Sequence, residues 1–175
     1  MKPLKAFKRI LIFGLPGSGK STFAVLLGQL LNLPVHHLDC YFFTENWQER
    51  NYQEFLQLHQ TLVDDPAWVI DGNATKSLEV RFAHADMAIY FRFNRLLCLW
   101  RVFKRMFSSG QQIQATPAGC SKKVRWQLIT YLWGFEKRVQ ENVERLRREY
   151  PGVLFYELHS DADAKKILNG LLKNA

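Results

Sequence analysis

Short apolar runs alternate with longer amphipathic stretches along the chain. The runs predict five strands, at residues 10–13, 35–38, 68–70, 87–93 and 153–156. The run at residues 10–13 is continuously apolar, which is typical of a strand covered by helices on both faces. Strands that alternate with helices favour an α/β fold with a mostly parallel sheet. The pattern therefore predicts one doubly wound layered sandwich.

Helical periodicity fills the intervals between these runs. The predicted helices follow the glycine-rich turn to about residue 31, then span about 52–63, 96–106, 122–149 and 162–172. In the first helix the shared apolar face consists of Phe23, Leu27, Leu30 and Leu31. Asn51 is the expected N-cap of the second helix. Residues 108–120 are rich in Gly, Pro, Ser, Gln and Thr without apolar periodicity, which predicts a loop.

Composition narrows the class of protein. A chain of 175 residues fits a single domain, and 47% apolar with 14% aromatic content excludes a disordered chain. No apolar run approaches the roughly 20 residues of a membrane helix, and no signal-peptide pattern follows the N-terminus, so cytoplasm is the expected location. Cys40, Cys98 and Cys120 form no Cys-x-x-Cys pair, so we expect buried or incidental thiols rather than disulfides or a zinc site.

The strongest chemical signal is a phosphate-binding motif that joins the first strand to the first helix. Its residues are Gly14-Leu15-Pro16-Gly17-Ser18-Gly19-Lys20-Ser21, which match the Walker A pattern of P-loop proteins. Glycines let consecutive amide groups converge on a phosphate, and the helix N-terminus adds positive potential. Lys20 is expected to bridge the β- and γ-phosphates of ATP, and the Ser21 hydroxyl to ligate Mg²⁺. A ligand-free glycine turn would not need that lysine and serine.

Charged residues at neighbouring positions extend this site. Asp71 and Asp39 each follow a predicted strand, and ligands of doubly wound sheets bind at the carboxyl ends of strands. We expect both to face Lys20, with Asp71 the better Mg²⁺ candidate, although an Asp-Gly turn is the common alternative. Arg101 and Arg105 lie one helical turn apart and could neutralise transferred phosphate, or else form a solvated basic face.

Two clusters are interpreted as structural. His36 and His37 lack a third ligand at metal-binding spacing, so we predict no metal site there. Tyr41, Phe42, Phe43 and Trp47 are expected to pack between the second strand and its helix, with a base-stacking platform as the less favoured alternative.

The chain resembles the bacterial topology modulation proteins, a branch of the adenylate-kinase-like and shikimate-kinase-like P-loop proteins. The resemblance spans nearly the whole sequence. It is carried, in order, by residues 14–22, His37-Leu38-Asp39, Trp47, residues 68–73, Arg81, Ala85-Asp86 and residues 97–105.

The resemblance implies a three-layer fold of nucleoside-monophosphate-kinase type, with a five-stranded parallel sheet in the order 2-3-1-4-5. It also implies an acceptor-binding region around residues 39–65 and a lid around 106–120. The implied cofactors are ATP, bound by residues 14–22 including Thr22, and Mg²⁺, organised by Asp71. Arg101 looks like the arginine that packs near adenine, Arg105 and Arg138 like phosphate-contacting arginines, and Asn73 and Arg81 like acceptor-side residues.

The segment around the lid departs from the family pattern. Family lids carry arginines, whereas this one reads Gln111-Gln112-Ile113-Gln114-Ala115-Thr116. Lys122, Lys123 and Arg125 are the candidates to replace them, although lysine cannot grip a phosphate bidentately.

Two functions fit the net charge of +8. The favoured one is a small-molecule kinase that transfers the γ-phosphoryl group of ATP to a nucleotide-like, hydroxyl or phosphate acceptor. The other is a nucleotide-dependent DNA-binding or regulatory protein whose basic stretches, 101–105, 122–125 and 145–148, follow a phosphate backbone. A membrane partner is not expected. No DNA-reading module is visible, and two anionic substrates also require positive charge, so we favour the kinase.

Overall fold

A computed structural model describes residues 7–106 and 126–173 of the chain. From residue 107 onward, the predicted lid lies outside the described residues. Cys120, Lys122, Lys123 and Arg125 lie outside them as well.

Five parallel strands form one sheet. They are β1 (Arg9–Gly14), β2 (Val35–His37), β3 (Trp68–Asp71), β4 (Met87–Phe91) and β5 (Leu154–Leu158). Their order is β2-β3-β1-β4-β5, and each neighbouring pair is parallel. The predicted fold class and strand order are therefore confirmed.

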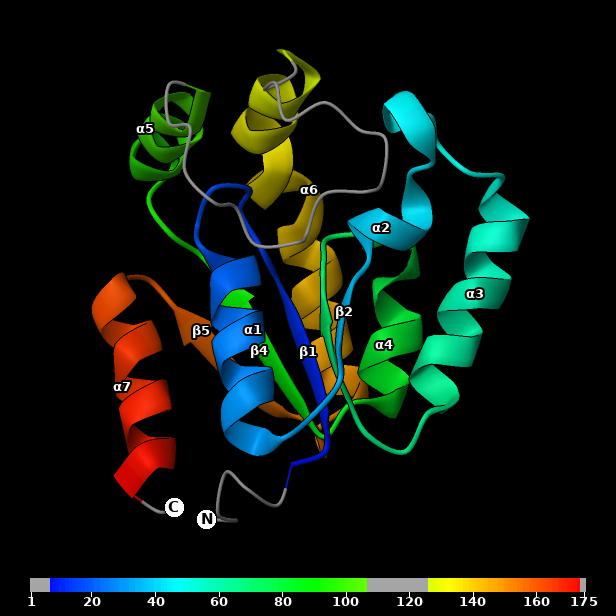
Figure 1. Ribbon diagram of the computed structural model, residues 1–175, viewed down its shortest axis with the longest axis vertical. Coiled ribbons are helices and arrows are strands. Elements are labelled where there is room, and N and C mark those ends of the chain that lie inside the picture. Colours follow the sequence, from blue (N-terminus) through cyan, green and yellow to red (C-terminus); the bar gives the residue numbers. More distant parts are fainter. Residues whose placement is uncertain (1–6, 107–125, 174–175) are drawn as a thin grey trace.

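Helices enclose the sheet on both faces (Figure 1). The α-helices are α1 (Lys20–Leu31), α2 (Asp39–Phe42), α3 (Tyr52–Asp64), α4 (Leu78–His84), α5 (Arg95–Met106), α6 (Trp126–Glu149) and α7 (Asp161–Lys173). Two short 3₁₀ turns, η2 (Glu45–Trp47) and η3 (Thr75–Ser77), complete the elements of the described ranges. In Figure 1, α1 and α7 lie on one side of the sheet, and α4 and α6 on the other.

Aromatic contacts join the layers because successive side chains of a strand point to opposite faces. Phe91 of β4 meets Phe23 of α1, with ring centroids 5.2 Å apart. On the other face, Phe13 stacks on Tyr90 at 4.8 Å and meets Phe82 of α4. The inner strands β1, β3 and β4 are almost fully buried, whereas the edge strands β2 and β5 are mostly half-buried.

One helix begins at its predicted cap, and two predictions about the helices need correction. The Asn51 side chain accepts hydrogen bonds from the first turn of α3, as predicted. Leu30 is exposed; α1 instead buries Ala24 and Gly28 beside Phe23 and Leu27. Helix α4 was not predicted, because its buried face includes a charged residue that interrupts the apolar pattern.

This topology brings the ends of three strands together. β1, β2 and β3 are neighbours and run in the same direction, so the segments that follow them meet at one edge of the sheet. Those segments are the glycine-rich turn, the start of α2 and residues 72–74. In Figure 1, α5 and the first turns of α6 lie at the same end of the molecule.

Candidate active site

The glycine-rich turn between β1 and α1, residues 14–21, has the geometry of a phosphate loop. Gly17 (φ 81°) is packed so tightly that a Cβ would lie 2.5 Å from the Cys98 carbonyl oxygen of α5. Gly19 (φ 90°) is the N-cap of α1, and no atom lies within 4 Å of a Cβ built there. Both φ values disfavour side chains. The loop is thus closed against α5 on one side and open above the helix.

The start of α1 is available to an anion. Gly19, the N-cap, has no side chain that could bond the amides of the first turn. The first amide that bonds within the helix is that of Phe23, which donates to the Gly19 carbonyl. Helix N-termini attract anions when their first amides lack partners. The predicted loop residues lie here: Leu15, Pro16 and Ser18 are buried, Lys20 and Ser21 are half-buried, and Thr22 is exposed. The Ser18 hydroxyl oxygen is buried without a hydrogen-bond partner among the described residues.

Asn73 secures the beginning of the loop. Its Oδ1 atom accepts a hydrogen bond of 3.0 Å from the Gly14 amide. The loop is held further by the Leu15 amide, which donates to the Phe91 carbonyl. Asn73 was predicted on the acceptor side, which stays a prediction; in the structure it braces the β3 loop against the phosphate loop.

Asp71 ends β3 and is only 3% exposed. Its Oδ2 atom lies 3.0 Å from Nδ1 of His37, which ends the neighbouring strand β2. Its Oδ1 atom is buried and has no hydrogen-bond partner among the described residues. A buried carboxylate oxygen without a partner is costly unless a ligand or water satisfies it. The arrangement leaves one oxygen for a cation or its water.

Asp39, the first residue of α2, is exposed at the same edge of the sheet. Although the residue as a whole is exposed, burial of its carboxyl group raises the pKa above the ordinary value. The positive charge of Lys20 opposes that rise, and the negative charge of Asp71 reinforces it. The structure therefore brings Asp39, Asp71 and Lys20 within electrostatic reach of one another.

Arg81 occupies a different position from the one expected of an acceptor-binding residue. It is fully buried in α4, and its guanidinium donates hydrogen bonds to the carbonyl groups of Gly72, Asn73 and Ala74, at 2.7 to 3.1 Å. Burial lowers its pKa, while the negative charges of Asp71 and Asp39 oppose that change. Arg81 thus shapes the loop after β3, and its acceptor-side role stays a prediction of the sequence.

Arg101 connects three elements beside the phosphate loop. Its guanidinium is ion-paired with Asp161 of α7 and lies 3.4 Å from the Ser18 carbonyl. It also lies over the Phe93 ring, 5.7 Å from the centroid. Arg105 is exposed in the last turn of α5, and no ion pair joins it to an acidic residue of the described ranges. The structure thus places Arg101 at the loop, with Arg105 farther along the helix.

Arg138 and Tyr131 belong to α6, whose first turns lie at the same end of the molecule. The Arg138 guanidinium donates to the Tyr131 carbonyl and lies 4.9 Å from the centroid of the Tyr131 ring. Burial raises the pKa of Tyr131 to about 12, and the positive charge of Arg138 opposes that rise. Arg138 was predicted, but Tyr131 was not, because no periodicity or motif distinguishes it from the other aromatic residues of the helix.

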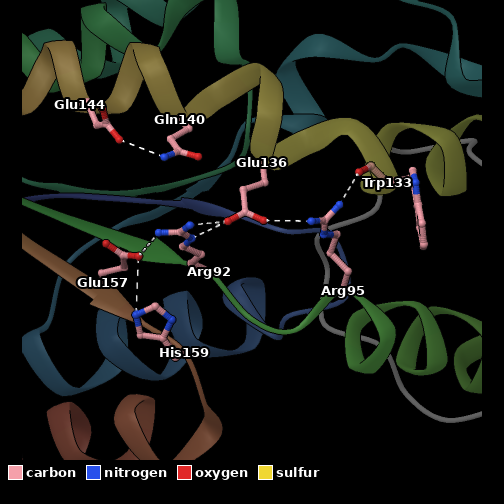
Figure 2. Close-up of polar contacts among 8 residues, drawn as sticks. All are labelled: Arg92, Arg95, Trp133, Glu136, Gln140, Glu144, Glu157 and His159. Carbon is pink, nitrogen blue, oxygen red and sulfur yellow. Dashed lines mark hydrogen bonds and ion pairs between the residues drawn. The ribbon is translucent and has the colours of Figure 1, made fainter.

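A charged cluster anchors α6 to the sheet away from the phosphate loop (Figure 2). Arg92, just after β4, lies between Glu136 of α6 and Glu157 of β5, and Arg95 also pairs with Glu136. Two surface hollows border this cluster, and neither is lined by a residue of the phosphate loop. We assign the cluster a structural role, since its charges satisfy one another.

The remaining candidates in the described ranges have structural partners. His36 bonds the Tyr41 hydroxyl at 3.0 Å. Phe43 meets Phe42 and Trp47 edge to face, in agreement with packing around α2. The two cysteines described, Cys40 and Cys98, form no disulfide. Neither a cluster of three metal-binding side chains nor a helix able to cross a membrane occurs in residues 7–106 and 126–173.

Comparison with known proteins identifies the fold. No family model and no curated protein sequence matches the chain. Among solved structures, a gluconokinase from Sinorhizobium meliloti 1021 aligns with a TM-score of 0.54 at 14% identity, covering 96% of this chain and 93% of that one. A shikimate kinase from Bacteroides thetaiotaomicron gives 0.53 at 16% identity over 95% of this chain and 99% of that one. A shikimate kinase from Acinetobacter baumannii in complex with shikimate gives 0.56 at 18% identity, covering 99% and 97%. The chain has the fold of these P-loop kinases.

Proposed function

We propose that the protein is a small-molecule kinase that transfers the γ-phosphoryl group of ATP to an acceptor bound beside Asp39. The observation that carries this proposal is the meeting of an open phosphate loop with Lys20, Asp39 and Asp71 at one sheet edge. Phosphoryl transfer requires mainly positioning and charge neutralisation, and the site offers both.

The nucleotide half of the site rests on α1 and α5. The amide groups of the loop and of the first turn of α1 would hold the phosphates, with Lys20 between the β- and γ-phosphates. Arg101, fixed by Asp161 and the Ser18 carbonyl, offers a flat guanidinium against which a base can stack. Arg105 and Arg138 are the further candidates for phosphate contacts.

The polar groups at the sheet edge fit Mg²⁺. Ser21 and the unpartnered Oδ1 of Asp71 would hold the ion or its waters. When bound, Mg²⁺ neutralises charge on the β- and γ-phosphates. His37 would keep Asp71 oriented through Oδ2.

The acceptor half contains the candidate general base. An acceptor hydroxyl oxygen attacks the γ-phosphorus, the bond from phosphorus to the bridging oxygen of ADP breaks, and the hydroxyl proton passes to Asp39. Asp39 suits this task better than Asp71, because Asp39 is open to solvent whereas Asp71 is buried and bonded to His37. A raised pKa strengthens Asp39 as a base.

The charge distribution of the described residues does not favour DNA binding. Arg101 is paired with Asp161, and Arg145 is paired with Glu79 and Glu149. These two basic stretches are therefore partly neutralised, and the third, 122–125, lies outside the described residues. Membership of the topology modulation protein family and a cytoplasmic location stay predictions of the sequence.

A screen for ADP formation tests the proposal. The purified chain is incubated with ATP, Mg²⁺ and single acceptors, including D-gluconate, shikimate, nucleosides and nucleoside monophosphates. The first two are included because the fold matches a gluconokinase and a shikimate kinase. We expect acceptor-dependent ADP formation that the Lys20→Ala variant lacks. ATP binding without turnover on any acceptor would count against a kinase.

A further inference from the structure

Exposed apolar side chains gather on α5. Nine large apolar side chains are exposed in residues 7–106 and 126–173, and four of them belong to this helix: Leu96, Leu97, Trp100 and Phe103. Leu96 is 65% exposed and Trp100 57%. Leu96, Trp100 and Phe103 follow one another at i, i+4 and i+7, so they form one stripe along the helix, here called the outer stripe. Clustered apolar side chains on a protein surface mark a contact with a partner.

The outer stripe points away from the phosphate loop. On the inner side of α5, Cys98 and Val102 are buried against Gly17, where a Cβ would lie 2.5 Å from the Cys98 carbonyl oxygen and 2.8 Å from Cγ2 of Val102. At 100° per residue, the outer stripe falls on the opposite side of the helix from these two residues. A partner on the outer stripe therefore leaves the nucleotide site open.

Positive charge accompanies the outer stripe. Helix α5 contains no acidic residue. Lys104 and Arg105 are exposed, and no ion pair joins either of them to an acidic residue of the described ranges. Arg95, by contrast, is paired with Glu136. The charge that is left uncompensated is positive, so an anionic partner complements this face.

Two exposed tryptophans each lie beside a cation. Nζ of Lys104 is 5.0 Å from the centroid of the Trp100 ring. Trp133 of α6 is 60% exposed, and the Arg95 guanidinium lies 5.9 Å from its ring centroid and donates to its carbonyl group (Figure 2). This contact joins Trp133 to the beginning of α5. Tryptophan and basic side chains together are typical of the boundary between lipid and water, where the ring is buried and its N–H group stays hydrated.

We propose that α5 docks on an anionic membrane surface, with the outer stripe among the lipid headgroups and Lys104 and Arg105 against their phosphates. A basic amphipathic helix of this kind lies in the plane of the interface. The sequence predicted no membrane partner because no segment can span a bilayer, but a helix that lies on the surface needs no such segment. The inference is independent of the proposed kinase reaction.

A second copy of the chain fits the same face less well. A two-fold interface places the same patch of both copies against itself. Lys104 and Arg105 of the two copies would then approach each other, and α5 has no acidic residue to separate them. Lipid phosphates supply the opposite charge, and headgroups adapt to protruding side chains without a preformed groove. These observations favour the membrane surface.

Vesicle binding tests the inference. The full chain is sedimented with vesicles of phosphatidylcholine alone, or of an equal mixture of phosphatidylcholine and phosphatidylglycerol. We expect the mixed vesicles to bind at least about tenfold more tightly at low salt, and the difference to shrink as salt is added. The tryptophan emission should shift to shorter wavelength on the mixed vesicles, because the exposed rings leave water.

Two variants separate the apolar and the charged contributions. Trp100→Ser should weaken binding to mixed vesicles at least about tenfold, and Lys104→Gln about fivefold. The matched controls are Leu26→Ser, at an exposed apolar site on α1, and Lys165→Gln, at an exposed site on α7; both should bind as the wild type does. Thermal unfolding followed by circular dichroism checks that each variant is folded.

The outcomes decide between the occupants. If mixed vesicles bind no more tightly than neutral ones, or if Trp100→Ser binds as the wild type does, the inference is wrong. A dimer that forms without lipid and that Trp100→Ser dissociates would also overturn it, since a second copy would then cover the outer stripe. The kinase proposal is tested by ADP formation without lipid, so the two proposals fail separately.

Discussion

His37 and Asp71 end two neighbouring strands and meet through Nδ1 and Oδ2, 3.0 Å apart. The contact directs the other carboxylate oxygen into a buried position where no described residue bonds it. A histidine that holds one oxygen of a carboxylate fixes the orientation of the other oxygen toward a metal. The pair therefore links the sheet to the proposed Mg²⁺ site.

We expect Asp71→Asn to reduce kcat at least about a hundredfold, because the neutral amide loses the charge that would organise Mg²⁺. His37→Ala should act through Asp71 and raise the Mg²⁺ concentration needed for half-maximal ADP formation by about tenfold. His37→Asn, which can still donate to Oδ2, should recover part of that loss. Titrating Mg²⁺ in the ADP assay measures all three. If His37→Ala needs no more Mg²⁺ than the wild type, His37 does not act on the metal site through Asp71.

Gly17→Ala should abolish nucleotide binding. The added Cβ would lie 2.5 Å from the Cys98 carbonyl, which is backbone and cannot swing aside, and φ is 81° at this residue. The loop must then leave α5, at a cost of about 2 kcal/mol in folding free energy. Urea unfolding and ATP-analogue titration measure the two effects. Gly152→Ala is the control, since a Cβ there meets no atom within 4 Å; tight analogue binding by Gly17→Ala would contradict the loop geometry.

Arg81→Met should destabilise the protein by about 3 kcal/mol, because the carbonyl groups of residues 72–74 lose their buried donors. Arg81→Lys should also destabilise it, since an ammonium group cannot span these carbonyl groups as the planar guanidinium does. Denaturant unfolding gives the free energies. A normally stable Arg81→Met variant whose only defect is a raised KM for the acceptor would restore the acceptor-binding role predicted from the sequence.

His59 should make the protein less stable in mild acid. It is fully buried on α3, stacked on Phe55, and neither ring nitrogen has a partner among the described residues. Burial, reinforced by the positive charges of Arg81 and His84, lowers its pKa from 6.5 to about 3. Between these values the unfolded chain binds the proton more readily than the folded one, so stability falls as pH decreases from 6.5 toward 3.

His59→Leu tests this dependence, because leucine removes the titrating ring and both unpartnered nitrogens. Its unfolding free energy should fall less between pH 6.5 and 4 than that of the wild type, with the difference approaching about 1.4 kcal/mol per pH unit well below 6.5. At pH 7 the variant should be at least as stable. His159→Gln, an exposed site, serves as the control. Equal slopes in the wild type and His59→Leu would show that another group governs acid stability.

The sequence predicted the sheet and the phosphate loop because both are governed by local rules. The apolar run at residues 10–13 is short and ends at a glycine, which favours a buried strand over a buried helix. The spacing of Gly14, Gly19 and Lys20 fits few functions besides phosphate binding. Helix α4 was missed for the opposite reason. Its central residue Arg81 is buried, and its guanidinium donates to the carbonyl groups of residues 72–74. The local sequence does not show that these carbonyl groups will accept hydrogen bonds from a buried charge.

The partners of the predicted residues were harder to predict from the sequence. Asp39 and Asp71 could be placed at one edge from strand ends alone. The role of His37 as the partner of Asp71 depends on the pairing of β2 with β3, which two adjacent histidines do not reveal. Gly134 was a readable signal, because a glycine inside a strongly helical stretch usually has a packing reason. It lies within α6, and a Cβ there would lie 2.3 Å from Nη1 of Arg138.

Time-resolved ³¹P NMR of the wild-type chain with Mg²⁺–ATP and the best acceptor from the screen tests the central claim most directly. The signal of the ATP γ-phosphate should decline as those of ADP and of a new phosphorylated acceptor rise at equal rates. Lys20→Ala and Asp39→Asn should slow this exchange at least about a hundredfold, because they remove phosphate bridging and proton acceptance. ATP loss that yields only inorganic phosphate, or transfer that is unaffected by Lys20→Ala, would contradict the account.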